Sequence, residues 1–152
     1  MPEIERRWLV DPTAVGDFAQ APCRRYEDLY LDGSRLRLRK ITDANGTELY
    51  KLGKKYGKQT ALSEPITTLY LSALEYGLFW RLPGRAAIKR RYAIEGGSLD
   101  VYEQPLPGFM VFELEFASEP SARGYEPPSF VTQEITGDAA YSGFALAGGR
   151  CT

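Results

Sequence analysis

The sequence of 152 residues contains no histidine and only two cysteines. The absence of histidine excludes Ser-His-Asp and Cys-His nucleophile systems, most zinc sites, and any imidazole acid or base. Cys23 and Cys151 show neither metal-ligand spacing nor a disulfide framework, so we interpret them as ordinary thiols. Any catalysis must therefore use carboxylates, lysine, tyrosine or a metal ion with oxygen ligands.

The sequence also lacks long apolar runs and an excess of either charge. No apolar stretch is long enough to span a bilayer, and the N-terminus, acidic from Glu3, does not resemble a signal peptide. Lys plus Arg (19) nearly equal Asp plus Glu (20), so no global field favours nucleic acid or an anionic membrane. We expect one cytoplasmic domain over residues 1–152 without a nucleic-acid or membrane partner. The oligomeric state stays open, with a homodimer as one option.

Short strands separated by turns account for most of the chain. Apolar alternation and turn residues predict strands over residues 3–10, 26–31, 35–39, 48–55, 66–71, 86–95, 99–103, 110–116 and 133–135. Capping and turn signals predict helices over residues 12–19 and 73–80, with shorter ones near 117–123 and from 138 onwards. Many consecutive strands and few helices indicate a mainly β, α+β fold. We expect an antiparallel sheet that is curled or closed into a barrel, because closure removes exposed edges.

Four of these strands carry pairs of like charges at alternate positions, so that both members share one face of the strand. The pairs are Glu3 and Glu5, Arg37 and Arg39, Lys89 and Arg91, and Glu113 and Glu115. For a single strand, a solvated face above an apolar one is a sufficient explanation. A solvated surface would gain from mixed signs, however, because neighbouring like charges repel. The segregation of signs by strand therefore favours a barrel with its charged side chains inside.

Charged side chains inside a barrel require a ligand that compensates them, because burying an unpaired ion costs several kcal/mol. A polyphosphate with divalent cations would compensate both signs. Arginine binds phosphate oxygens with paired N–H donors, and carboxylates supply the oxygen ligands that Mg²⁺ or Mn²⁺ prefers. The pattern thus indicates an interior that binds polyphosphate together with one of these metals.

The same residues resemble a known family. The segment Glu3-Ile4-Glu5-Arg6-Arg7 is similar to the ExExK signature of the CYTH superfamily, the triphosphate tunnel metalloenzymes. Further matching segments, in family order, are 37–39, 50–54, 89–92, 100–102, 108–116 and 134–136, followed by Asp138 and Tyr141. The resemblance covers nearly the whole chain and points most closely to small bacterial inorganic triphosphatases. It implies a closed eight-stranded antiparallel β-barrel with flanking short helices, which forms a tunnel for triphosphate and divalent metal.

The resemblance also implies roles for individual residues. Those implied in triphosphate binding are Arg37, Arg39, Lys54, Lys89 and Arg91. Lys54 is preferred over Lys51 and Lys55 as the inward lysine because it shares a strand face with Tyr50 and Leu52, as the family's lysine does. Those implied in metal binding are Glu3, Glu5, Glu113 and Glu115. Glu64, Asp100 and Glu134 are weaker candidates. The strand that carries Glu64 is poorly defined. Asp100 and Glu134 are stronger by resemblance, but a lone acid at a strand end is more often a solvated cap than a ligand.

One position departs from the family pattern. The third residue of the signature is lysine, which in the small triphosphatases is thought to pair with a tyrosine that matches Tyr30 here. This sequence has Arg7 instead, which keeps the charge but cannot act as a general base. Glu5, Arg7 and Tyr30 are the candidate catalytic residues, with water activation expected from metal and carboxylates. A purely structural strand tyrosine is the alternative for Tyr30.

Two classes of function remain open on this basis. The first is a metal-dependent hydrolase of triphosphate phosphoanhydride bonds, with inorganic triphosphate as the expected substrate. The second is a non-catalytic module that binds polyphosphate or nucleotide, and Arg7 is the residue that keeps it open. A nucleoside or thiamine triphosphatase, or an adenylate cyclase of the same superfamily, is a further alternative.

Overall fold

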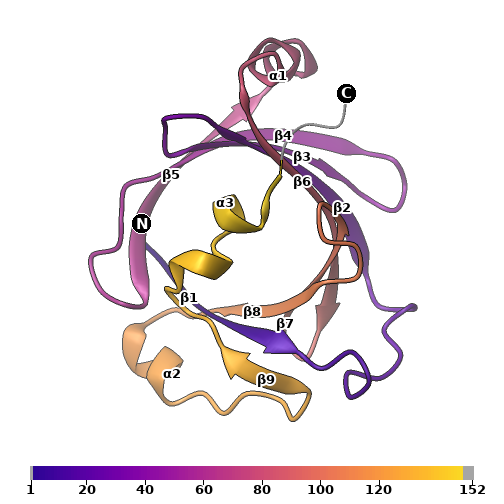
Figure 1. Ribbon diagram of the computed structural model, residues 1–152, viewed down its shortest axis with the longest axis vertical. Coiled ribbons are helices and arrows are strands. Elements are labelled where there is room, and N and C mark those ends of the chain that lie inside the picture. The colour runs from indigo at the N-terminus through magenta and orange to yellow at the C-terminus, as the bar shows by residue number, and fades with distance from the viewer. Residues whose placement is uncertain (1, 149–152) are drawn as a thin grey trace.

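The computed structural model describes residues 2–148, which form a closed ring of antiparallel strands (Figure 1). The strands are β1 (Pro2–Val10), β2 (Cys23–Leu31), β3 (Leu36–Thr42), β4 (Glu48–Lys55), β5 (Ser63–Leu71), β6 (Gly84–Ile94), β7 (Gly97–Gln104), β8 (Met110–Glu115) and β9 (Val131–Glu134). Their order is β5-β4-β3-β2-β6-β7-β8-β1-β9, and β5 also pairs with β1. The predicted eight-stranded barrel is thereby confirmed, with β9 as one extra strand beside β1.

Strand pairing places alternate residues on opposite sides of the wall. Leu29 of β2 lies opposite Leu38 of β3, and both are buried in an apolar cluster on the outside of the ring. The adjacent pair, Asp28 and Arg39, points the other way, because successive side chains of a strand face opposite sides. The ring therefore carries apolar residues outward and charged residues inward on these strands.

Helix α1 (Ala73–Trp80) covers the outer apolar cluster at one side of the ring (Figure 1). The Ser72 side chain accepts a hydrogen bond from the Glu75 backbone, and the Glu75 side chain accepts one from the Ser72 backbone. This reciprocal cap satisfies two free N–H groups and begins the helix where the sequence predicts it. Tyr76, Phe79 and Trp80 of α1 pack on the cluster that contains Leu29 and Leu38.

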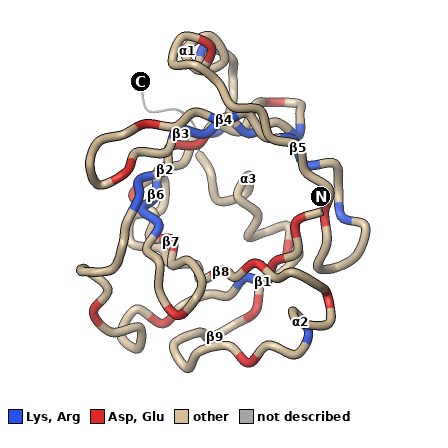
Figure 2. The backbone as a smooth tube through the Cα atoms, turned by 180° about the vertical axis from the view of Figure 1, so that it is seen from behind, with Lys and Arg blue, Asp and Glu red and all other residues tan. Residues whose placement is uncertain are grey.

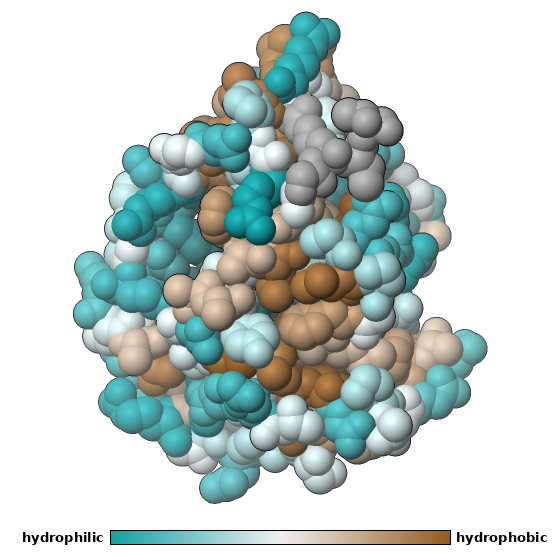
Figure 3. Space-filling model, in the orientation of Figure 1, coloured by the Kyte–Doolittle hydropathy of each residue, from teal (hydrophilic) through white to brown (hydrophobic). Residues whose placement is uncertain are grey.

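The C-terminal segment lies within the ring in projection (Figure 1). It consists of the 3₁₀ helix η1 (Ala139–Tyr141) and helix α3 (Gly143–Leu146), divided at the extended residue Ser142. Leu146 and Ala147 are buried together with Val111 of β8, and apolar side chains fill the middle of this face (Figure 3). Part of the barrel interior is therefore an apolar core.

The predicted helix over residues 12–19 is wrong. Asp11 accepts hydrogen bonds from Thr13, Ala14 and Val15, which make a single turn. Gly16 then adopts a positive φ of 77°, so the backbone leaves the helical region. The short helix predicted near 117–123 is present as α2 (Glu119–Arg123), outside the ring beside β9.

Two remaining expectations concern membrane spans and cysteines. No helix of the described residues combines the length and the apolar character needed to cross a membrane. Cys23 is a free thiol at the start of β2, and Cys151 lies outside the described residues.

Candidate functional site

A cavity of about 420 Å³ lies inside the ring and is lined by charged side chains from six strands. Cations come mainly from β3, β4 and β6 and acids from β1, β5 and β8, a separation that is visible along the backbone (Figure 2). The charged residues that line it are Glu3, Glu5, Arg7, Arg35, Arg37, Arg39, Lys54, Lys55, Lys58, Glu64, Lys89, Arg91, Glu113, Glu115 and Asp138. Tyr30 lines it as well. The sequence-predicted site residues other than Asp100 and Glu134 thus meet at one cavity.

Asp28 and Arg39 form a buried ion pair in the cationic wall. Arg39 donates from Nε and Nη2 to the two carboxylate oxygens at 2.7 and 2.8 Å. Burial alone would raise the pKa of Asp28, but the charge and hydrogen bonds of Arg39 lower that pKa to about 2. Arg39 is therefore held in one orientation by a carboxylate that stays ionised.

Asp100 organises the other half of this wall. It lies opposite Arg91 across β6 and β7, accepts two hydrogen bonds from that guanidinium at 2.8 and 2.9 Å, and lies 2.8 Å from Lys89 Nζ. Although burial acts to raise the pKa of Asp100, these two cations lower it. Arg91 also donates to Glu113 at 2.6 Å. The expectation that Asp100 could be a solvated cap is wrong, since it is 1% exposed and fixes two cations.

Arg37 differs from its neighbours because it has no acidic partner among the described residues. Its Nε atom is buried and makes no hydrogen bond there. Leaving a buried charged donor unsatisfied is costly, and Arg37 lines the cavity, so an anion bound there would compensate its charge. Arg37 is therefore the strongest candidate for a first contact with phosphate.

The acidic wall places four carboxylates around β1 and β8. Glu5 lies opposite Glu115 across these strands, and Arg7 lies opposite Glu113. Burial raises the pKa of Glu5 to about 7, and the neighbouring charges of Glu113 and Glu3 add to the shift. Burial, followed by Glu3 and Glu113, also raises the pKa of Glu115. These oxygens are short of positive charge, and hard oxygen donors of this kind suit Mg²⁺ or Mn²⁺. Within residues 2–148, no three of these carboxylates lie close enough together to hold a metal ion between them.

The inward lysine is Lys55 rather than Lys54, which corrects the sequence-based choice. Leu52 faces the outer apolar cluster with Leu38, so the face that Lys54 shares with Leu52 is the outer one. Lys54 accordingly lies exposed at the rim, with Nζ 4.9 Å from the ring centre of Tyr56. Lys55 points inward and lies 3.4 Å from Glu3.

The other two weaker candidates have different positions. Glu64 is buried, lines the cavity and accepts a hydrogen bond from the Gly57 backbone at 3.0 Å. Glu134 does not line the cavity. Its carboxylate accepts two hydrogen bonds from Arg6, at 2.7 and 2.9 Å, and one from Thr136. The structure therefore places Glu134 outside the cavity and paired with Arg6.

Comparisons with known proteins agree with this geometry. The chain is 32% identical over 154 residues to an inorganic triphosphatase of Nitrosomonas europaea, with 97% of each chain covered. The chain belongs to the CYTH-type triphosphatase family. Its fold is similar to crystal structures described as the hypothetical protein NE1496 and the inorganic triphosphatase NE1496. The TM-scores are 0.58 and 0.57 at 28% identity, with 95% of this chain and 97% and 93% of those chains covered. A scan against protein-family models finds no match.

Arg7 is tightly held in this CYTH-type triphosphatase. Its Nε lies 3.3 Å from Glu113, and its Nη1 donates to the Tyr141 backbone oxygen at 2.7 Å. Burial acts to lower the pKa of Arg7, but Glu113 and Glu5 raise it overall, so the guanidinium stays charged. It therefore links the acidic wall to the C-terminal segment and cannot accept a proton.

Sequence reasoning missed two residues of this CYTH-type tunnel, Asp28 and Tyr26. The Tyr26 ring is 3% exposed and lies between two cations, with Arg39 and Arg91 at 4.5 and 4.6 Å from its centre. The sequence did contain a pattern that places both residues inside the barrel, because Tyr26, Asp28 and Tyr30 alternate along one strand as the charged pairs do. The signal was weak because the three residues do not share a charge.

Proposed function

We propose that this protein hydrolyses inorganic triphosphate inside the barrel. The observation that carries the proposal is the division of one cavity into a cationic wall and an acidic wall. A triphosphate needs cations along its oxygens, and its metal counterion needs carboxylates, so the two walls match the two halves of a metal–triphosphate complex. The inorganic triphosphatase at 32% identity supports the same substrate for this chain.

We also propose that the reaction depends on Mg²⁺ or Mn²⁺ held by Glu3, Glu5 and Glu115. The raised pKa values of Glu5 and Glu115 support this assignment, since they mark carboxylates that gain from a nearby cation. Glu113 would contribute to the same site while it keeps its contacts with Arg7 and Arg91. Such a metal would neutralise phosphate charge and make a bound water more acidic.

The residues of the chain would then act mainly by positioning and electrostatics. Arg37, Arg39, Lys89 and Arg91 bind the phosphate oxygens, and Lys55 replaces Lys54 in this set. Arg7 stabilises negative charge, while Glu5, as one of the carboxylates that hold the metal, orients the attacking water. Tyr30 orients substrate from the cavity wall, where Gly143 leaves room for its hydroxyl.

Phosphate release from inorganic triphosphate tests the proposal. Wild-type protein should release phosphate with Mg²⁺ or Mn²⁺ and stop when the metal is chelated. Glu113→Gln should reduce the rate by about a hundredfold, since it weakens two cation contacts and a metal ligand. Arg7→Lys should retain activity. If the wild type binds triphosphate but releases no more phosphate than Glu113→Gln, the chain is a binding module instead.

A substrate panel separates the remaining alternatives. Inorganic triphosphate should be hydrolysed faster than ATP or thiamine triphosphate, and cyclic AMP should not form from ATP. The cytoplasmic location and the homodimer stay predictions, for which cell fractionation and sedimentation velocity are the measurements. The exposed apolar residues Leu69, Leu74 and Leu78, at the end of β5 and on α1, are the surface we expect a homodimer to use.

A further inference from the structure

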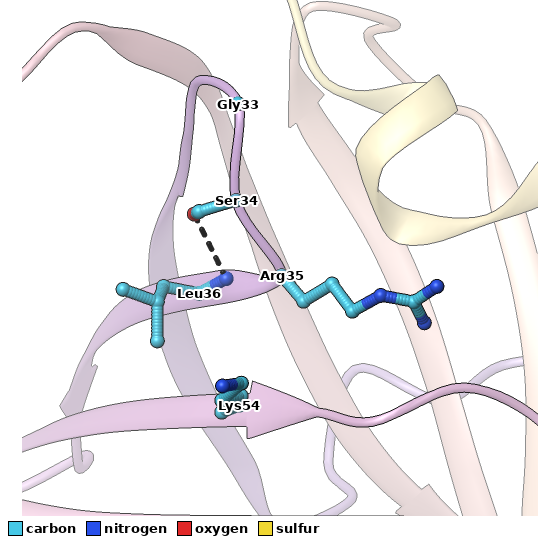
Figure 4. A pocket seen from close by; sticks show the side chains of 5 residues that line it. All are labelled: Gly33, Ser34, Arg35, Leu36 and Lys54. Carbon is cyan, nitrogen blue, oxygen red and sulfur yellow. Dashed lines mark hydrogen bonds between the residues drawn. The ribbon is translucent and has the colours of Figure 1, made fainter.

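Arg7 is held by more contacts than the arginine at the rim of the cavity. Arg35, at the turn between β2 and β3, points away from Lys54 and makes no hydrogen bond to the other residues labelled in Figure 4. The Arg7 guanidinium, by contrast, contacts Glu113 and the backbone oxygen of Tyr141. The backbone of Arg7 is also held, by residues whose role the cavity itself does not explain.

This backbone lies where β1 changes neighbours, because the first residues of β1 pair with β5 and its last residues pair with β9. Ile135 donates its N–H to the Arg7 carbonyl oxygen at 2.8 Å, and the Arg7 N–H donates to Oγ1 of Thr136 at 2.9 Å. Both backbone groups of Arg7 therefore face the segment that follows β9. On the other edge, Arg7 and Glu113 form an antiparallel pair of the kind without mutual backbone hydrogen bonds.

The Thr136 side chain replaces a backbone acceptor at this point. In a regular ladder Arg7 would donate to the carbonyl oxygen of Ile135, its partner in the register of β1 and β9. That oxygen instead accepts a hydrogen bond from the Asp138 N–H at 3.0 Å, in a turn that contains Gly137 with a positive φ of 71°. The Thr136 hydroxyl takes the place of the missing acceptor, so its removal would leave the Arg7 N–H without this partner.

Glu134 fixes the orientation of the Thr136 hydroxyl. Hydrogen bonds from Arg6 and Thr136 lower the pKa of Glu134, so its carboxylate is ionised and can only accept. Thr136 Oγ1 lies 2.7 Å from this carboxylate and therefore donates its proton to it, which leaves a lone pair for the Arg7 N–H. Arg6 holds the carboxylate in turn, at 2.7 and 2.9 Å. A chain of hydrogen bonds thus runs from Arg6 through Glu134 and Thr136 to the backbone of Arg7.

We propose that Glu134 and Thr136 are positioning residues for Arg7, which fix its backbone so that its guanidinium faces the cavity. The inference rests on the proposed function, in which Arg7 stabilises negative charge on the substrate. Neither Glu134 nor Thr136 lines the cavity, so each acts through Arg7 and not on the substrate. The segment that contains them also supports the other end of the side chain, since the Tyr141 carbonyl oxygen binds the guanidinium.

Threonine variants test the hydrogen bond to Arg7. Thr136→Val removes the hydroxyl and nearly keeps the shape of the side chain, so kcat/KM for triphosphate with Mg²⁺ should fall about tenfold, as expected for an N–H that loses its acceptor. Thr136→Ser keeps the hydroxyl and should stay within about twofold of the wild type. Thr132→Val is the matched control and should leave kcat/KM unchanged, because Thr132 is exposed on β9 and its hydroxyl contacts only the Leu9 carbonyl oxygen there. Glu134→Ala should lower kcat/KM in the same direction as Thr136→Val.

A double-mutant cycle shows whether Thr136 acts through Arg7. Arg7→Gln alone should lower kcat/KM, because it removes the guanidinium charge. If Thr136 works by placing that charge, adding Thr136→Val to Arg7→Gln should change kcat/KM by less than about twofold. Equal losses from Thr136→Val in both backgrounds would overturn the proposal. An unchanged kcat/KM in Thr136→Val, or an equal loss in Thr136→Ser, would overturn it as well.

NMR spectroscopy separates this inference from the proposed function, because it needs no hydrolysis. The Nε–H signal of Arg7, assigned by its absence in Arg7→Lys, should shift or broaden in Thr136→Val and keep its wild-type position in Thr132→Val. If these changes occur but the wild type releases no phosphate from triphosphate, the proposed function fails and the positioning of Arg7 stands. An Arg7 signal that Thr136→Val leaves unchanged would overturn the positioning role whatever the activity.

Discussion

Asp28 and Asp100 determine how the cations of the tunnel are presented to a ligand. Each aspartate lies behind the cavity and binds guanidinium or ammonium groups that face into it. The cations are thus neutralised on one side and open on the other, which reduces the cost of burying them. At the residue scale the wall is a preformed array rather than a set of mobile side chains.

Tyr26 should act as a positioning residue, because its ring separates two of these cations. Tyr26→Leu removes the aromatic face that contacts Arg39 and Arg91, and a desolvated cation–π contact contributes about 2 kcal/mol. We expect about a thirtyfold higher KM for triphosphate by this magnitude, with kcat nearly unchanged. Tyr26→Phe keeps the ring and should restore the wild-type KM. A loss of kcat in both variants would contradict a positioning role.

The Asp28–Arg39 pair should make stability depend on acid pH. Since the pKa of Asp28 is lowered to about 2 in the folded protein, the unfolded chain binds more protons between pH 2 and pH 4. The pair therefore contributes about 2 kcal/mol above pH 4, and this is lost as the pH falls toward 2. Asp28→Asn should lower the free energy of unfolding at pH 7. It should also reduce the fall of that free energy between pH 4 and pH 2, as measured by urea unfolding. If the loss of unfolding free energy between pH 4 and pH 2 is the same in the variant, other carboxylates cause that loss.

Elements defined by local interactions were predictable, and those defined by distant partners were less so. Helix α1 has its predicted bounds because Ser72 and Glu75 cap it within one turn. Strand β5 instead begins at Ser63, ahead of the predicted start, because its first residues pair with Pro2–Ile4 of β1. The inward lysine of β4 was missed for the same reason, since both faces of that strand carry lysines and only the pairing with β3 distinguishes them.

The assignment of β4 faces gives a matched pair of lysine variants. Lys55→Gln should raise the KM for triphosphate about three- to tenfold, because a partly exposed charge contact with phosphate is lost. Lys54→Gln should leave that KM within about twofold, because Lys54 belongs to the outer row. Steady-state kinetics with Mg²⁺ measure both. The reverse ranking would mean that β4 presents its other face to substrate.

At the scale of the whole molecule, the net charge of −1 is small although one wall of the cavity is cationic and the other is acidic. The closed barrel and its charged interior were predictable, because segregated charges and short strands are sequence properties. The placement of η1 and α3 against the interior was not, since the four-residue α3 has no sequence period that shows what it packs on. Asp138 and Ser142, which cap these short helices, were the available local signals.

Leu146 should be the residue through which the C-terminal segment stabilises the barrel. It is 5% exposed and packs in the cluster with Val111 and Ile135, so Leu146→Ala should lower the free energy of unfolding by about 2–4 kcal/mol. Leu106→Ala, at a 41% exposed leucine, should change it by less than about 1 kcal/mol. Urea unfolding followed by tryptophan fluorescence compares the two. Equal changes in the free energy of unfolding would show that the C-terminal segment does not contribute to the apolar core.

The pairing of β1 with strands near both the middle and the end of the chain constrains the order of folding. Arg7 of β1 pairs with Glu113 of β8, 106 positions later, and β9 follows beyond that. A nascent chain cannot complete this ring until nearly all of it has left the ribosome, and contacts so distant in sequence form slowly. Until then β1 is an open edge that other strands can join. The same strand that carries the acidic wall is therefore the part of the chain that most needs protection during synthesis.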